Sequence, residues 1–241
     1  MLNHLTRTDT ERQPKPMLII FDCDGVLVDS EILAKKVELS VYGEQGFEAS
    51  LEEFSERFSG MTGSEIMRDI EDDLDKGLPE TLHDDIQTRI DDKLATELNA
   101  IANVHEMLDR LDNPRCICSN SSMERLAISL KRTKLHDRFR PYIFSATEVG
   151  NKEPKPSANV FLHAAEQLEA NPAETIVLED SVHGVTGAVK AGMRVVGFTG
   201  GSHTYPTHAE SLMDAGAETT INKLLDFPAV VEAFKEWDGR L

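Results

Sequence analysis

Short apolar segments that alternate with amphipathic helical stretches constrain the fold of this chain more than any other feature of its sequence. The apolar segments lie at 17–21, 115–119, 142–145, 175–178 and 194–198. Runs of this length are typical of strands that are buried on both faces of a parallel sheet. Helical spacing of apolar residues occurs between them, at 104–111, 123–130, 158–168 and 182–191. The alternation predicts an α/β fold with a doubly wound parallel sheet.

The interval between the first two predicted strands is much longer than a single connecting helix requires. Residues 31–102 contain no convincing strand, and capping boxes at 50–53 and 62–65 mark the starts of two helices. We therefore predict a small α-helical domain inserted in the α/β core. The predicted division of the chain is a polar N-terminal tail at 1–16, a core domain formed by 17–30 and 103–241, and the inserted helical domain at 31–102.

The charge of the chain disfavours two classes of partner. With 43 acidic against 25 basic residues, the formal net charge is −18. This charge argues against binding to nucleic acid and to anionic membrane surfaces. The inserted segment alone holds 19 acidic and 7 basic residues, which we interpret as a solvated outer helix surface.

The cysteines and the beginning of the chain indicate a cellular compartment. Cys23, Cys116 and Cys118 are too few for a disulfide framework, and their spacing does not fit a zinc site. The first sixteen residues lack the apolar segment of a secretory signal, and no apolar stretch approaches the roughly 18 residues that a membrane-spanning helix needs. We expect a cytoplasmic protein with no membrane partner.

Two closely spaced carboxylates follow the first predicted strand. Asp22 and Asp24 share one face of an extended chain, and Gly25 allows a sharp turn after them. In open α/β sheets, ligands bind beyond the carboxyl ends of the strands. Two carboxylates this close need a cation or a shared proton. An EF-hand calcium loop does not fit, because its glycine and glutamate positions are Leu27 and Leu33.

The segment 21–30, FDCDGVLVDS, resembles the first motif of the haloacid dehalogenase (HAD) superfamily. Ser119, at the end of the second predicted strand, fits the second motif. Lys155, which precedes a proline, fits the third motif better than Lys152 does. The acidic pair at 179–180 fits the fourth. Four motifs in the right order are far more specific than any one of them.

The resemblance extends over about residues 17–225 and assigns roles to the motif residues. It implies that Asp22 is the nucleophile, which forms an aspartyl phosphate, and that Asp24 is the general acid and base. Ser119 and Asn120 would bind the phosphoryl group, and Lys155 would bind it and neutralise its developing charge. The inserted helices would form the C1 cap of the superfamily's phosphatase and phosphomutase branch.

The resemblance also implies a magnesium ion as cofactor. Its ligands would be Asp22, the backbone carbonyl of Asp24, and Asp180, with Glu179 as a further candidate. Magnesium prefers hard oxygen ligands of this kind. The metal would offset repulsion between these carboxylates and an incoming phosphate.

Two residues narrow the reaction that the resemblance implies. Asp24 points to a phosphate ester as substrate, because the leaving alkoxide needs a proton. Ala34 stands where β-phosphoglucomutases carry a histidine, which favours a phosphatase over a phosphomutase. A β-phosphoglucomutase-like phosphomutase is the first alternative, and a non-catalytic interaction protein with this fold is the second.

The predicted cap contains a candidate specificity loop at 58–64. Ser59, Thr62 and Ser64 would offer hydroxyl groups to a polyol or sugar acid, with Gly60 and Gly63 shaping the loop, although the two glycines fit helix punctuation equally well. Sequence motifs here resemble those of 6-phosphogluconate phosphatases and related sugar-phosphate phosphatases. We predict a magnesium-dependent phosphatase acting on small phosphorylated sugars or sugar acids; the physiological substrate and the oligomeric state stay open.

Overall fold

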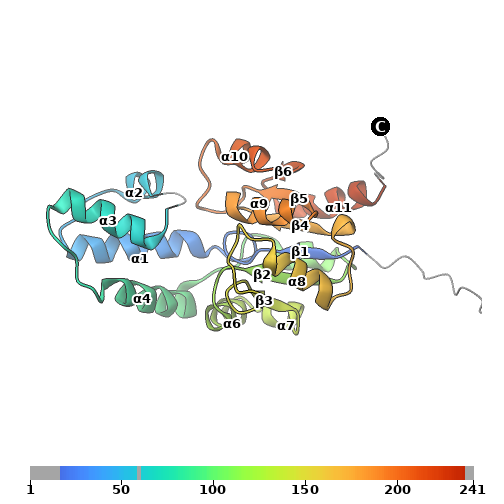
Figure 1. Ribbon diagram of the computed structural model, residues 1–241, viewed down its shortest axis with the longest axis horizontal. Coiled ribbons are helices and arrows are strands. Elements are labelled where there is room, and N and C mark those ends of the chain that lie inside the picture. Colours follow the sequence, from blue (N-terminus) through green and yellow to red (C-terminus); the bar gives the residue numbers. More distant parts are fainter. Residues whose placement is uncertain (1–16, 59–60, 237–241) are drawn as a thin grey trace, which may run out of the picture.

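A computed structural model describes residues 17–58 and 61–236 of the chain (Figure 1). The N-terminal tail predicted at 1–16 lies outside these residues. Six parallel strands form one sheet in the order β3-β2-β1-β4-β5-β6. The strands are β1 (Ile19–Phe21), β2 (Arg115–Ser119), β3 (Ile143–Ser145), β4 (Ile176–Glu179), β5 (Arg194–Phe198) and β6 (Thr219–Ile221). The predicted fold class, a doubly wound parallel sheet, is confirmed.

Helices cover both faces of the sheet because alternate strand residues point to opposite sides. Ile19 and Phe21 of β1 belong to one buried apolar cluster, and Ile20 belongs to another. The first cluster takes in α5 (Val104–Asp109), α6 (Met123–Arg132), α7 (His136–Phe139) and α11 (Phe227–Glu236). The second takes in α8 (Asn159–Gln167), α9 (Val182–Lys190) and α10 (His208–Asp214). Two short 3₁₀ turns, η1 (Pro172–Glu174) and η2 (Leu224–Asp226), complete the core.

Strand β6 was not predicted from the sequence. Its residues are Thr219, Thr220 and Ile221, and both threonines are only half-buried. The strand lies at the edge of the sheet beside β5, where polar side chains reach solvent. A three-residue edge strand of this composition carries no apolar run, so its sequence gives no strand signal.

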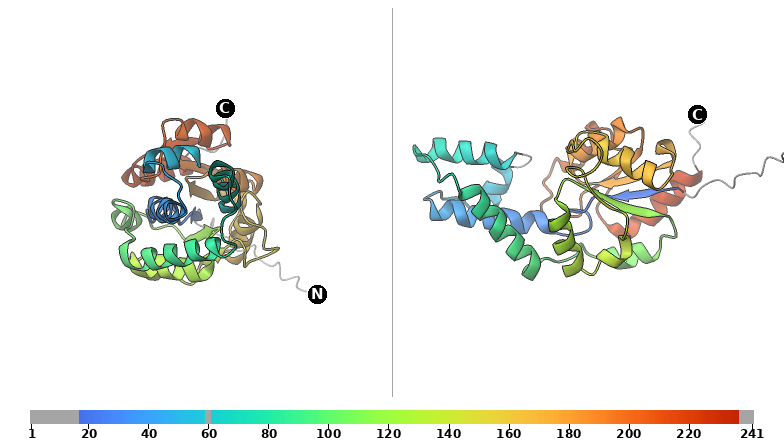
Figure 2. Two further views of the ribbon diagram at one scale, coloured as in Figure 1. Left: turned by 90° about the vertical axis from the view of Figure 1, so that its left-hand side faces the viewer. Right: turned by 60° about the horizontal axis from the view of Figure 1, so that its bottom comes forward.

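Among the described residues, four helices precede α5 in the interval between β1 and β2. They are α1 (Ser30–Glu44), α2 (Leu51–Arg57), α3 (Gly63–Leu74) and α4 (Leu82–Glu97). Both predicted capping boxes are present, with Ser50 and Glu53 starting α2 and Thr62 and Glu65 starting α3. The four helices lie beyond the carboxyl end of β1, as a group beside the sheet (Figure 2).

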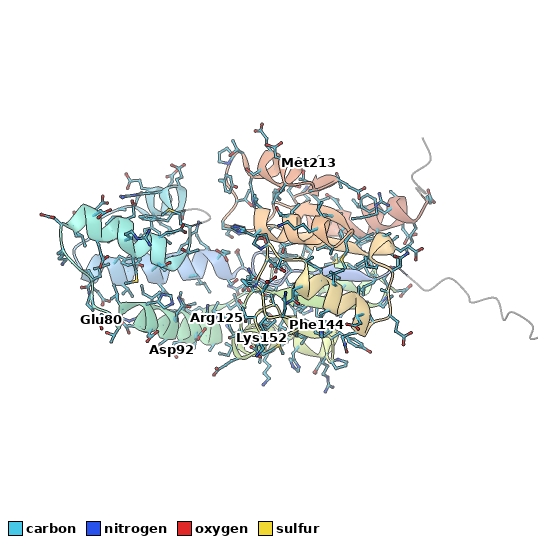
Figure 3. All side chains as sticks on the ribbon, viewed as in Figure 1. Glu80, Asp92, Arg125, Phe144, Lys152 and Met213 are labelled. Atoms are coloured by element: carbon cyan, nitrogen blue, oxygen red, sulfur yellow. The ribbon has the colours of Figure 1, made fainter. Side chains whose placement is uncertain are left out.

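The inserted helices carry much of their charge on the outside. Glu80 and Asp92 are exposed on the outer surface, whereas Arg125 lies where α4 meets α6 (Figure 3). The Nε of Arg125 donates to Oδ1 of Asp91 in α4 at 2.6 Å, which ties the inserted helices to the core. Among residues 17–58 and 61–236, no helix is long and apolar enough to cross a membrane.

Candidate active site

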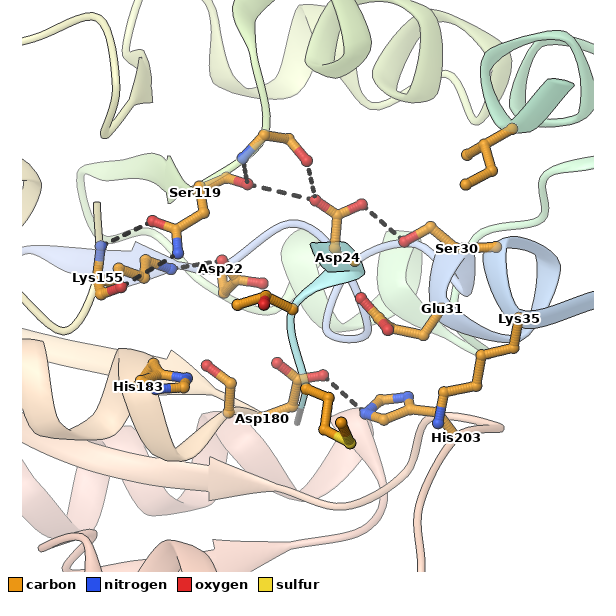
Figure 4. A pocket seen from close by; sticks show the side chains of 18 of the residues that line it. Asp22, Asp24, Ser30, Glu31, Lys35, Ser119, Lys155, Asp180, His183 and His203 are labelled. Atoms are coloured by element: carbon orange, nitrogen blue, oxygen red, sulfur yellow. Dashed lines mark hydrogen bonds and ion pairs between the residues drawn. The ribbon is translucent and has the colours of Figure 1, made fainter. Parts of the chain in front are cut away.

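The predicted site residues converge at the carboxyl end of the sheet. Asp22 follows β1, Ser119 ends β2, and Glu179 ends β4 with Asp180 directly after it. Because β2, β1 and β4 are neighbours in the sheet, their ends bring together residues that are far apart in sequence (Figure 4). Lys155 reaches the same point from the loop between β3 and α8, and all five residues are buried.

Lys155 forms the centre of a buried ion network. Its Nζ lies 2.5 Å from Oδ1 of Asp22 and 2.5 Å from Oε1 of Glu179. Burial alone would lower the pKa of Lys155, but the two carboxylates outweigh it and hold this pKa above its ordinary value. Lys152, the other candidate for the third motif, is exposed. The structure therefore brings Lys155, and not Lys152, to the acidic cluster.

Three buried carboxylates share this small volume. Asp22, Glu179 and Asp180 each offer an oxygen, and the three oxygens lie within 4.8 Å of one another. Burial raises the pKa of Asp22 well above its ordinary value, and the neighbouring carboxylates oppose the effect of Lys155. Burial likewise raises the pKa of Asp180. One lysine cannot balance three carboxylates, so the cluster fits a hard divalent cation.

Both oxygens of Glu179 already have partners within the protein. Oε1 accepts the bond from Lys155, and Oε2 accepts from the backbone N–H and the hydroxyl of Ser181, each at 2.9 Å. The turn into α9 passes so close that a Cβ at Gly184 would lie 1.7 Å from Oε1. Glu179 therefore orients Lys155 and is itself held by Ser181.

Three serine hydroxyls orient the carboxylate of Asp24. Ser30, the first residue of α1, donates to Oδ1 at 2.6 Å. Ser121 and Ser119 donate to Oδ2 at 2.8 and 3.3 Å. These bonds fix the direction of the Asp24 carboxylate, which lines the same cavity as Asp22.

Ser30, the last residue of the first motif, and Ser121 were given no role in the sequence analysis, because the sequence does not show which carboxylate a serine hydroxyl will contact. Asn120, predicted to bind phosphate, is tied to the backbone of Lys155: its Oδ1 accepts from the Lys155 N–H at 2.8 Å, and its Nδ2 donates to the Lys155 carbonyl at 3.4 Å. Asn120 also lines the cavity described below. It thus holds the Lys155 loop against the end of β2.

Two histidines contact Asp180, and the sequence analysis named neither. Nε2 of His203 lies 2.9 Å from Oδ2 of Asp180, and Nε2 of His208 donates to the Asp180 carbonyl at 2.6 Å. Burial lowers the pKa of His203 and of His208. The available signal was the Gly200-Gly201 pair in the loop that begins after β5, where a ligand-binding loop is expected in an α/β sheet.

A cavity of about 920 Å³ opens between the strand ends and the inserted helices. The inserted helices contribute an apolar wall that includes Phe58, Met61, Ile66, Ile90 and Leu94. Helix α1 contributes Glu31, Lys35 and Glu38. Burial raises the pKa of Glu31, and it raises the pKa of Glu38 to about 7. The cavity is thus apolar on one side and carries buried charge on another.

The predicted cap loop is partly visible at this cavity. Thr62 and Gly63 line it, whereas Ser59 and Gly60 lie outside the described residues. Thr62 also accepts a bond from the Glu65 N–H as the N-cap of α3. Ser64 is exposed, with its hydroxyl 3.1 Å from that of Thr62. Ala34 also lines the cavity.

A parallel α/β core with an Asp-Xaa-Asp pair, a lysine and an acidic pair at its strand ends, beneath inserted helices, defines a class of hydrolases. The chain belongs to the haloacid dehalogenase-like hydrolase family, which matches residues 19–198. The chain is therefore a hydrolase of this family, in agreement with the resemblance of its four motifs.

Similar proteins include one with a curated activity and two of known structure. The chain is 27% identical over 221 residues to the 6-phosphogluconate phosphatase of Escherichia coli, covering 91% of this chain and 96% of the relative. A conserved haloacid dehalogenase-like protein of unknown function from Agrobacterium tumefaciens is 49% identical, with a TM-score of 0.85 over 91% of this chain and 99% of that one. A HAD family hydrolase from Deinococcus radiodurans, solved with bound phosphate and sodium, is 28% identical, with a TM-score of 0.80 over 92% and 98%.

Proposed function

We propose that this protein is a magnesium-dependent phosphatase that hydrolyses small phosphorylated sugars or sugar acids through an aspartyl-phosphate intermediate. The observation that carries the proposal is the buried cluster of Asp22, Asp180 and Lys155 at the strand ends, directly beside the oriented carboxylate of Asp24. This arrangement combines a nucleophile, a cation site, a fixed positive charge and a general acid in one cavity.

The residues present fit magnesium. Its ligands would be the side chains of Asp22 and Asp180 and, by the family pattern, the backbone carbonyl of Asp24. All of these donors are hard oxygen atoms, and the excess of buried negative charge calls for a divalent cation. When bound, the metal supplies positive charge that offsets the repulsion between carboxylates and phosphate.

The protein's own residues would carry the reaction in two steps. In the first, a carboxylate oxygen of Asp22 attacks phosphorus, the ester P–O bond breaks, and Asp24 gives a proton to the leaving oxygen. In the second, Asp24 takes a proton from water, which attacks the phosphorus and releases inorganic phosphate and free Asp22. Ser119 and Lys155 would bind the phosphoryl oxygens and stabilise the charge that develops on them.

The inserted segment is proposed to act as a cap that selects the leaving group. We assign the cap to residues 31–102 and the core to 17–30 and 103–241. In support, α1, α3 and α4 contribute to the wall of a cavity whose volume suits a hexose phosphate. The 6-phosphogluconate phosphatase of Escherichia coli, similar over most of both chains, supports phosphorylated sugars and sugar acids as the substrate class. A cytoplasmic location is part of the proposal.

Ala34 favours hydrolysis over phosphoryl transfer between positions of a sugar. Its methyl group lines the cavity and, unlike a histidine ring, cannot bind or release a proton. Proton transfer from Asp24 therefore does not depend, through this position, on a bound sugar. Water can therefore be activated whenever the aspartyl phosphate is formed. This argument places the phosphatase ahead of the β-phosphoglucomutase-like alternative.

A substrate panel with and without Mg²⁺ tests the proposal. The panel contains sugar phosphates, polyol phosphates and phosphorylated sugar acids, and free phosphate is measured for the wild type and for Asp22→Asn. We expect metal-dependent release that Asp22→Asn abolishes. Release that survives in Asp22→Asn, or that needs no divalent metal, would contradict the mechanism. Conversion of glucose 1-phosphate to glucose 6-phosphate with little free phosphate would instead identify a mutase.

A further inference from the structure

The loop after β5 reaches the proposed metal site, yet none of its residues has a role in the proposed reaction. Its residues Gly200, Gly201, Ser202 and His203 follow Thr199, the first residue after β5. The side chain of His203 is 12% exposed, and its Nε2 lies 2.9 Å from Oδ2 of Asp180. In Figure 4, His203 approaches Asp180 from the side of Lys35, opposite the side on which Lys155 lies.

A carboxylate from the first motif anchors this loop. The backbone N–H of Ser202 donates to Oδ1 of Asp29 at 3.1 Å, and the Ser202 hydroxyl donates to Oδ2. Asp29 occupies the N-cap position of α1, but its side chain makes no capping bond to that helix. An aspartate at this position normally caps the helix. Here its carboxylate instead holds a loop that is 173 residues away in sequence.

Two glycines let the backbone pass close to the His203 ring. At Gly25, with φ of +79°, a Cβ would lie 1.9 Å from Oδ2 of Asp180 and 2.7 Å from Cε1 of His203. At Gly201, a Cβ would lie 2.7 Å from the His203 ring and 3.0 Å from the Gly25 carbonyl oxygen. Any side chain at either position would push the ring away from Asp180. The contact between His203 and Asp180 thus depends on the backbone around it.

We propose that His203 is a positioning residue for Asp180: its Nε2–H donates to Oδ2 and leaves Oδ1 for the cation shared with Asp22. Asp29, acting through Ser202, holds His203 in place. This inference rests on the proposed magnesium site. Hydrogen bonds to the outer oxygen of a metal-binding carboxylate fix its orientation, and their loss typically weakens metal binding by about 10–100-fold.

The experiment measures metal affinity in the absence of substrate. Mn²⁺ binding to the resting full-length protein is followed by electron paramagnetic resonance, and Mg²⁺ is measured by competition. His203→Leu removes the donor, His203→Gln keeps an N–H donor at similar reach, and His136→Leu, in α7, is the matched control. We expect the Mn²⁺ dissociation constant to rise about 10–100-fold in His203→Leu, and to equal the wild-type value within experimental error in His203→Gln and His136→Leu.

Steady-state kinetics of the same variants distinguishes an effect on metal binding from an effect on substrate binding. His203 also lines the cavity, so KM tests whether it contacts the substrate. At saturating Mg²⁺, the KM of His203→Leu for the best substrate of the panel should stay within about threefold of the wild type, because the proposal assigns the histidine to Asp180 and not to the substrate. A folded His203→Leu protein with wild-type Mn²⁺ affinity would overturn the proposal. Failure of His203→Gln to restore the affinity would also overturn it, because the donor would then not be what matters.

A second variant covers the case in which His203→Leu does not fold. Ser202→Ala removes only the hydroxyl contact with Asp29, and we expect the Mn²⁺ dissociation constant to rise about threefold, as for one weakened outer hydrogen bond. Unchanged affinity in Ser202→Ala would refute the anchoring by Asp29. If the wild-type protein binds no divalent cation, both the proposed magnesium site and the role of His203 are contradicted. If the wild type binds Mn²⁺ but His203→Leu binds it equally well, only the role of His203 is contradicted.

Discussion

Ion pairs of the same length occur in two regions of this molecule, and burial makes them different in kind. In the inserted helices, Arg57 and Asp69 lie 2.5 Å apart with both side chains 41% exposed. At the strand ends, Lys155 and Asp22 also lie 2.5 Å apart, with 2% and 9% of their side chains exposed. Solvent screens the first pair, so it adds little to stability. The second pair has lost its water and depends on its protein partners.

This difference in burial distinguishes charged groups that keep a surface solvated from charged groups that can take part in a reaction. The outer pairs of the inserted helices, such as Arg89 with Glu44, compensate part of an acidic surface. The buried network holds three carboxylates near one lysine, an arrangement that burial disfavours unless a cation completes it. Short distance alone therefore does not mark a functional pair; distance together with burial does.

Removing the buried lysine should have the largest effect. In Lys155→Met, Asp22 and Glu179 lose their partner, so we expect the free energy of unfolding at pH 8 to fall by about 3–5 kcal/mol. The value of kcat should fall by about 10²–10³-fold, because charge on the phosphoryl group is no longer offset. Denaturant titration and phosphate release measure the two effects. Lys152→Met is the control, since Lys152 is exposed in the neighbouring loop.

The pH dependence of this loss follows from Asp22. Burial raises its folded pKa and Lys155 opposes that shift, so removing Lys155 raises the folded pKa further. A carboxyl group whose folded pKa lies above its unfolded value destabilises the protein as pH rises. The stability difference between wild type and Lys155→Met should therefore be larger at pH 8 than at pH 5. Equal losses at both values would show that the carboxylate is not the destabilised group.

A hydrogen bond to the general acid should matter less than the buried ion pair. Ser121→Ala removes the 2.8 Å bond to Oδ2 of Asp24 while leaving Ser30 in place. We expect kcat to fall about tenfold, as for one hydrogen bond to a charged group, with KM within about twofold. Ser211→Ala is the control, because its hydroxyl donates to the Thr207 carbonyl in α10. A Ser121→Ala enzyme with wild-type kcat would show that the other two hydroxyls suffice to orient Asp24.

The residues that could be predicted from sequence share a local signature. Asp22, Ser119 and Asp180 each stand at the end of an apolar run, so periodicity alone places them at one edge of the sheet. The capping boxes of α2 and α3 are read within four residues. In these cases a few neighbouring residues determine the local structure. The pairing of parallel strands then brings their carboxyl ends, and the residues on them, to one edge of the sheet.

The residues that were missed have partners far away in the chain. Ser121 meets Asp24 across 97 residues, and Ser202 meets Asp29 across 173. The sequence around each serine is ordinary, and only the packing of the loops after β2 and β5 against the first motif shows the two pairings. Glu179 illustrates the same limit, because the sequence shows an acidic pair but not that Lys155 and Ser181 occupy both of its oxygens. Long-range contacts of single polar groups leave no periodicity to detect.

Glu38 tests whether a half-buried charge in the cavity behaves like the buried site. Its folded pKa of about 7 lies above the ordinary value of 4.5, with burial as the main cause. Well below pH 4.5, Glu38 is protonated in both the folded and the unfolded protein. As pH rises from 4.5 through 7, Glu38 ionises in the unfolded protein first, so the free energy of unfolding falls. Glu38→Gln should therefore raise the free energy of unfolding by about 1–2 kcal/mol at pH 8, allowing for its partial exposure.

The same substitution should have a much smaller effect on stability at pH 5, where nearly all of the folded protein carries Glu38 protonated and ionisation has begun only in the unfolded protein. Denaturant titrations at pH 5 and pH 8 give the comparison, with Glu80→Gln on the exposed outer surface as the control. A stabilisation that is the same at both pH values would mean that the amide improves packing, and that the ionised carboxylate is not the cause.

The exposed ion pair should give the smallest effect, and this completes the comparison. Asp69→Asn breaks the contact with Arg57, which keeps Asp73 as a partner and lies over the ring of Phe58 at 5.0 Å from its centroid. We expect Tm to change by about 2 °C or less, and kcat/KM to stay within about twofold. Differential scanning calorimetry and phosphate release measure both. A fall of ten degrees, or a marked loss of activity, would show that the surface pairs of the inserted helices organise the cavity, so that burial would no longer separate the two kinds of ion pair.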